Sequence, residues 1–229
     1  MILNHLQGKL ESRYDLDIPY EVANFVCHDP LMARELSAAS IADHNHQAIE
    51  TNTEVVFVRQ LEDTMEMTLY LDRELVTSIE NDQANNRTVF EEGQSVPNAT
   101  VDELCTVVEG VSHVVCLLWH AHNDRQIRPV DLELQAEIDK FMMLMDRYQN
   151  QTECRQLHRQ LFDHSELIPE PGSNIYERYR IASNMAARYC HWLMVSFAGP
   201  YDQSGLDAEL ARFYRLSGHA KFDYIKRLH

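Results

Sequence analysis

Apolar residues recur at helical spacing through most of the chain, most regularly in its middle. From Leu104 to Leu118 they follow at intervals of three and four, which places them on one face of a helix. Thr100 and Glu103 have the spacing of a capping box. The pattern therefore predicts a helix from Thr100 to about His122.

A second helix is predicted directly after this one. Pro129 suits a first helical turn, where its missing N–H needs no partner, and the apolar pattern continues to Tyr148. Glu137 lies inside the apolar stripe, so it must find a partner or take up a proton. Three interpretations fit it: a buried ion pair, a functional acid or a position at the rim. Glu133, one turn earlier, fits a solvated acid near the helix start.

Strand patterns are strong only between residues 54 and 71. Residues 54–59 are β-branched and aromatic, and residues 64–71 alternate between apolar and polar, which predicts an antiparallel hairpin. A further apolar helix is expected over residues 175–197. The predicted fold class is α+β and predominantly α-helical, with a helical bundle-like core and a small antiparallel β-hairpin near the N-terminal side.

The polar, turn-prone stretch of residues 81–98 is the best internal boundary. It divides the chain into an α/β portion with the hairpin, residues 1–98, and a helical portion, residues 99–229, which we expect to form one compact globular unit. The segment containing His44 and His46 is expected to be an exposed polar loop, although a strand would place both imidazoles on one side.

Composition narrows the classes of function. A formal net charge of −16 argues against nucleic-acid or anionic-membrane binding, because both need a basic surface. The 5 cysteines show no C-x-x-C spacing, which is typical of reduced thiols in a cytoplasmic protein. Neither a signal peptide nor a membrane-spanning apolar run is evident. The 12 histidines favour a pH-sensitive or metal-contacting site.

One stripe of the first central helix carries residue types that bind metals. Glu109, His113, Cys116 and His120 fall within roughly 60° of one another on the helical wheel, opposite the apolar face. The plainer interpretation is the solvated face of an amphipathic helix. Gly110 costs this helix on the order of 1 kcal/mol, so either another backbone comes close there or the helix bends.

If the three longest predicted helices pack side by side, several charged and metal-binding side chains would lie close together. Glu109, His113, Glu133 and Glu137 could then converge, with Arg178 as the counter-charge of Glu137. Carboxylates and histidines on facing helices form metal sites in helical bundles. The divalent-metal hypothesis uses Glu109, His113 and Glu133, with His120 as a further candidate ligand. The E-x-x-H and H-E-x-x-H motifs are both missing from the sequence.

Two classes of function remain. The first is a cytoplasmic regulatory or scaffolding protein that binds another protein, which fits the missing catalytic motifs, the acidic surface and a hairpin edge able to accept a strand. The second is a metal-dependent carboxylate and histidine enzyme with its site between the central helices. Metal content discriminates between these hypotheses.

Overall fold

The computed structural model describes residues 2–42, 46–50, 54–62, 64–84, 101–146, 151–163, 172–197, 203–216 and 218–228. Its helices are α1 (Ile2–Tyr14), α2 (Pro30–Ala42), α3 (Arg73–Ala84), α4 (Val101–His122), α5 (Pro129–Met145), α6 (Gln151–Phe162), α7 (Asn174–Ser196), α8 (Gln203–Tyr214) and α9 (His219–Arg227), with a short 3-10 helix η1 (Val22–Phe25). Its strands are β1 (Val26–Cys27), β2 (His46–Glu50), β3 (Glu54–Gln60) and β4 (Met65–Leu71). The predominantly helical α+β class is confirmed.

The strands form one mixed sheet in the order β1-β4-β3-β2. β3 and β4 make the predicted antiparallel hairpin, in register from Glu54 opposite Leu71 to Gln60 opposite Met65. The prediction of a hairpin alone was incomplete, because β2 adds antiparallel to β3 and β1 adds parallel to β4. β1 has two residues, too few for any periodic pattern.

The loop predicted around the histidine pair is partly wrong. His46 begins β2 and pairs with Arg59, so the backbone here is a strand. His44 lies outside the described residues. β2 is too short for its alternation of apolar and polar residues to predict a strand. Its pairing with β3 stabilises the extended backbone instead.

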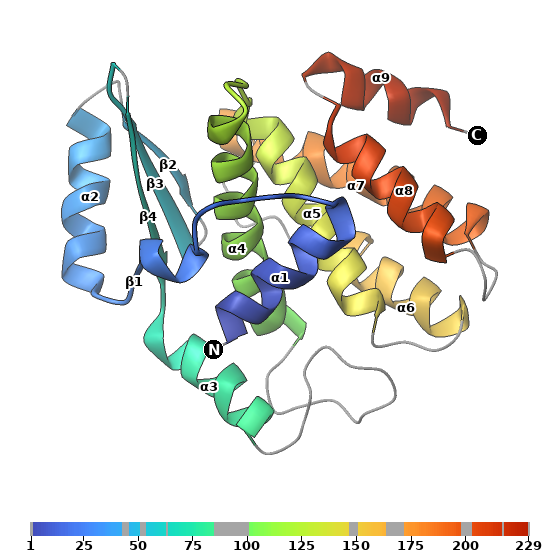
Figure 1. Cartoon of the computed structure of the whole chain (residues 1–229), viewed down its shortest axis with the longest axis horizontal. Coiled ribbons are helices and arrows are strands. Elements are labelled where there is room, and N and C mark those ends of the chain that lie inside the picture. The colour runs from blue at the N-terminus through green and yellow to red at the C-terminus, as the bar shows by residue number, and fades with distance from the viewer. Residues whose placement is uncertain are drawn as a thin grey trace.

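Helix α4 lies at the centre of the molecule, between the sheet and α5 (Figure 1). It contacts β3 and β4 on one side and α5 and α1 on others, so every residue from Val107 to His120 is buried. The solvated-face interpretation of its polar stripe is therefore wrong. α4 is also long and apolar enough to cross a membrane by length and composition, and 83% of its most apolar window is buried inside this protein, as a central helix requires.

Local sequence signals set the ends of several helices. α5 begins at Pro129, as predicted. The Ser173 hydroxyl caps α7 by accepting a hydrogen bond of 3.0 Å from the backbone N–H of Tyr176. Asp72 caps α3 in the same way through the N–H of Glu74 at 2.8 Å. Thr100, the predicted cap of α4, lies outside the described residues.

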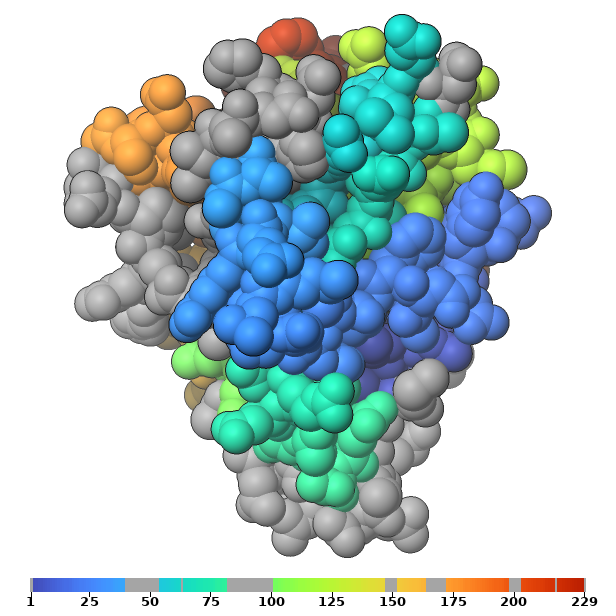
Figure 2. All heavy atoms as spheres, turned by 90° about the vertical axis from the view of Figure 1, so that its left-hand side faces the viewer, coloured from blue at the N-terminus to red at the C-terminus, as the bar shows by residue number. Residues whose placement is uncertain are grey.

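Helices cover both faces of the sheet. α2 covers the outer face of the sheet, where Figure 2 shows it at the surface above α3, and α4 covers the inner face. α5 packs against α4 and also against α7, so it lies between these two helices. Buried apolar residues from both sequence portions, including Leu69 of β4 and Val111 of α4, form one continuous core.

Candidate metal centre

A cluster of charged side chains lies inside this core, where α4, α5, α7 and the start of β3 meet. Glu109 and His113 are one turn apart on α4, Glu133 comes from α5, and Glu54 is the first residue of β3. Arg178 reaches the cluster from α7. Tertiary packing of the sheet on α4 thus brings residues 54 and 109 together across a long stretch of sequence.

His113 stands between two carboxylates. Its Nδ1 is 3.6 Å from Glu54 Oε1, and its Nε2 is 3.5 Å from Glu133 Oε2. The side chains of His113 and Glu54 have no solvent exposure, and Glu133 has 1%. One ligand atom from each of Glu54, Glu109 and His113 lies within 4.8 Å of the other two. The arrangement is compact enough for a single cation to touch several of these groups.

The contacts of His113 with the two carboxylates are longer than hydrogen bonds. Both distances from His113 exceed the usual 2.7–3.2 Å of an N–H···O hydrogen bond. Within the described part of the chain, neither imidazole nitrogen of His113 and neither carboxylate oxygen of Glu133 has a hydrogen bond. Buried polar groups in folded proteins are normally hydrogen-bonded, and these atoms instead have only ion-pair contacts with one another and with Arg178.

The outer side of the cluster reaches solvent. Lys140 Nζ donates to Glu109 Oε2 and to Glu137 Oε1, both at 2.9 Å. Arg178 Nε lies 3.1 Å from Glu133 Oε1. Side-chain exposure rises from zero at His113 to 12% at Lys140 and 20% at Arg178. An ion entering the cluster would therefore pass this rim.

Gly110 allows the strand to approach the helix. A Cβ atom at this position would lie 2.9 Å from Glu54 Cγ and 3.0 Å from Leu69 Cδ1. Real Cβ atoms essentially never come as close as the first of these distances. The prediction of a close backbone at Gly110 is corrected, because the groups that approach are the side chains of Glu54 and Leu69.

The cluster shifts the pKa values of its members strongly. Burial alone would lower the pKa of His113, but Glu133 and Glu54 outweigh it and raise that pKa to about 10. Burial raises the pKa of Glu54 to about 7, against the opposing effect of His113. Burial also acts to raise the pKa of Glu109, but Lys140 and His113 prevail and hold it below its ordinary value. Without another cation, His113 therefore carries a proton.

The structure brings most of the predicted residues together, with three corrections. Glu133 is buried, with 1% side-chain exposure, and is not a solvated acid. Arg178 pairs with Glu133 and not with Glu137, whose partner is Lys140. Residues 133 and 137 lie about 6 Å apart along the axis of α5, and Arg178 lies at the level of Glu133. His120 is also outside the cluster, because seven residues from His113 correspond to about 10 Å of rise. Its Nδ1 lies 2.8 Å from the Cys116 carbonyl oxygen instead.

Sequence reasoning missed Glu54 and Lys140. Glu54 is the charged first residue of β3, directly before the apolar run of residues 55–58, and its full burial follows only from the packing of β3 on α4. Lys140 lies three residues after Glu137, a spacing that places both on one helix face. The spacing from Glu137 was the sequence signal for Lys140, and the glycine at position 110 was the sequence signal for a close neighbour such as Glu54.

A second buried polar network in the same helices has a hydrogen-bond partner for each of its carboxylate oxygens. The Asp139 carboxylate on α5 accepts hydrogen bonds from the hydroxyls of Tyr14 and Ser112 and from Gln135 Nε2. Gln135 Oε1 in turn accepts a hydrogen bond of 2.8 Å from Lys221 Nζ of α9. This network joins α1, α4, α5 and α9 and leaves Asp139 well bonded, so its role is structural.

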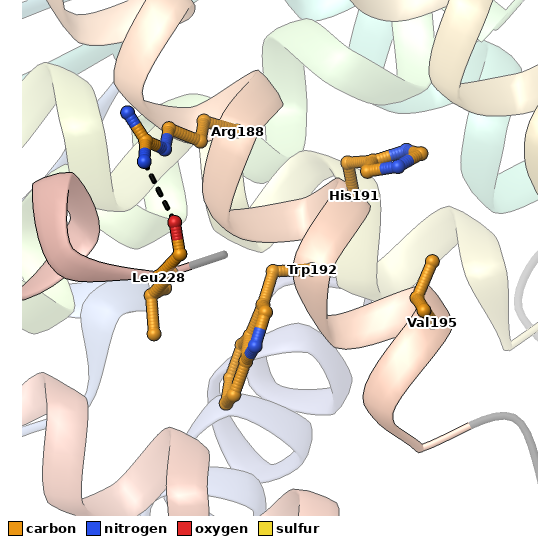
Figure 3. A pocket seen from close by; sticks show the side chains of 5 residues that line it. All are labelled: Arg188, His191, Trp192, Val195 and Leu228. Atoms are coloured by element: carbon orange, nitrogen blue, oxygen red, sulfur yellow. Dashed lines mark hydrogen bonds between the residues drawn. The ribbon is translucent and has the colours of Figure 1, made fainter.

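A surface groove of about 460 Å³ is a weaker candidate site. It is lined by Arg188, His191, Trp192, Val195 and Leu228, of which the first four project from α7 (Figure 3). Arg188 Nη2 donates to the carbonyl oxygens of Leu228 at 2.6 Å and Lys226 at 3.0 Å. Its guanidinium therefore holds the C-terminal end of α9, which accounts for its position without a ligand.

No protein-family model, curated protein sequence or solved structure matches this chain in comparisons with known proteins.

Proposed function

We propose that this protein binds one divalent transition-metal ion through Glu54, Glu109 and the Nδ1 atom of His113, with Glu133 holding the opposite ring nitrogen, and acts as a metal-dependent enzyme. The observation that carries the proposal is the compact group of buried ligand atoms from Glu54, Glu109 and His113, all within 4.8 Å of one another. An ion is one of the partners that such buried polar groups require.

The charge of the cluster supports a divalent ion. Within the described residues, the carboxylates of Glu54, Glu109, Glu133 and Glu137 face two permanent cations, Lys140 and Arg178. With His113 neutral, the state in which it binds a metal, two negative charges would remain uncompensated; without a metal, the proton on His113 reduces this to one. Uncompensated buried charge costs several kcal/mol, and one divalent ion would remove it.

The donor types narrow the choice of metal. Carboxylate oxygens with one imidazole nitrogen, and no thiolate, suit Mn²⁺, Fe²⁺ or Zn²⁺ better than Cu⁺. Such an ion supplies Lewis acidity and lowers the pKa of bound water. The solvent-reaching rim at Arg178 and Lys140 is where a small substrate could approach.

Metal analysis tests the proposal. The purified chain, dialysed against Mn²⁺, Fe²⁺ or Zn²⁺, should retain one ion per chain, and uptake should release protons because histidine binds metals as neutral imidazole. His113→Gln and Glu109→Gln should lose most of the metal. The matched controls are exposed residues of the same types, His122→Gln and Glu177→Gln, which should keep it. A wild-type chain that retains none of the three metals would refute the proposal.

A protein-binding role is the second candidate. Its supporting observation is that β2 lies at the edge of the sheet, and no described strand pairs with its outer side. A partner strand could add there through backbone hydrogen bonds. The net charge of −16 would favour a basic partner. A metal-free chain that purifies in a fixed complex with a basic protein would support this role over the enzyme.

A further inference from the structure

The cluster holds more carboxylates than one metal ion needs. Besides the residues around His113, Glu137 lies next to Glu109 through a shared contact with Lys140. Helical bundles use such sets of carboxylates to hold two metal ions about 3.5–4 Å apart. The residue types alone therefore leave the number of ions open, and the geometry around Lys140 decides it.

Lys140 fills the position that a second ion would take. Its ammonium lies 2.9 Å from Glu109 Oε2 and 2.9 Å from Glu137 Oε1, so it lies between the two carboxylates. A metal ion bridging the same oxygens would have to displace it, since metal–oxygen distances of about 2.0–2.2 Å leave no room for both. Lys140 is 12% exposed and reaches this position from α5, the helix that also carries Glu137.

We infer that Lys140 restricts the cluster to a single metal ion by occupying the second cation position between Glu109 and Glu137. This inference rests on the proposed function and adds the residue that sets the metal stoichiometry. Electrostatics supports it: with one divalent ion the cluster is neutral, whereas two ions beside Lys140 and Arg178 would leave an excess of two positive charges in a buried site.

The test is a titration with Mn²⁺, followed by elemental analysis and electron paramagnetic resonance. The wild-type chain should bind one Mn²⁺ with the hyperfine-resolved spectrum of an isolated ion. Lys140→Met keeps the length of the side chain and removes its charge, and should raise the stoichiometry from one to two with an exchange-coupled spectrum. Lys140→Arg retains the cation and should stay at one. The exposed Lys226→Met is the matched control and should also stay at one.

The outcomes separate this inference from the proposed function. A wild-type chain with two coupled ions, or a Lys140→Met chain that still binds only one, overturns the role of Lys140 and leaves the metal site standing. A wild-type chain that binds no Mn²⁺, Fe²⁺ or Zn²⁺ overturns both. If Lys140→Met does not fold, the wild-type spectrum decides: an isolated ion supports the inference, and a coupled pair overturns it.

Discussion

Replacing Gly110 by Ala should destabilise the protein although it improves helix propensity. Alanine is favoured over glycine in a helix interior by about 1 kcal/mol. At position 110 the added methyl would lie 2.9 Å from Glu54 Cγ and 3.0 Å from Leu69 Cδ1, and overpacking of this kind costs about 1–3 kcal/mol. The overlap should outweigh the gain, giving a net loss of about 1 kcal/mol.

Gly8 provides a matched control in the same protein. It lies inside α1, and a Cβ atom there would meet nothing within 4 Å. Gly8→Ala should therefore stabilise by up to about 1 kcal/mol, and the two variants should differ by about 2 kcal/mol. For a chain of this size that corresponds to a difference of about 4–8 °C in melting temperature.

Urea unfolding and thermal melting of both variants measure this difference. A double-mutant cycle identifies the cause of the difference. Gly110→Ala should lower the free energy of unfolding by less in a Glu54→Ala background, because the overlapping Cγ atom is then absent. Metal retention should fall in Gly110→Ala and not in Gly8→Ala, since Glu54 must move away. If Gly110→Ala is as stable as Gly8→Ala to within about 0.5 kcal/mol, the close packing of β3 on α4 is not what requires glycine.

Two further predictions concern the structural polar groups. Burial lowers the pKa of His120 to about 4, so between pH 6.5 and 4 the unfolded chain binds more protons and stability falls as the pH is lowered. The urea midpoint should drop less from pH 7 to pH 5 in His120→Gln than in the exposed control His122→Gln; equal drops would contradict the assignment. Tyr14→Phe removes one donor to the buried Asp139 and should cost about 1–3 kcal/mol in unfolding experiments. The exposed Tyr20→Phe should cost nothing measurable, and a neutral Tyr14→Phe would show that the hydroxyl is dispensable.

Local signals predicted the helix ends because their causes are local. Pro129 acts through its own backbone geometry, so its role at the start of α5 can be read without knowledge of the fold. The alternation of residues 65–71 likewise follows from the period of a strand.

The candidate site was predictable only in part, because a helical wheel gives direction but not surroundings. The stripe of Glu109 and His113 was identified, but its burial depends on the sheet and α5 covering α4 from both sides. A helical wheel also does not show the position of a residue along the helix axis. It therefore could not distinguish Glu133 from Glu137 as the partner of Arg178, whereas the fold does. Glu54 required a contact between distant segments, which no local pattern reports.

The contact between Gly110 and Glu54 limits how this protein can diverge. A lineage that acquires any side chain at position 110 must also shorten residue 54 or shift the strand, because the two occupy the same space. The two sites should therefore evolve as a pair: glycine persists where the acid persists, and its replacement is accompanied by loss of the acid.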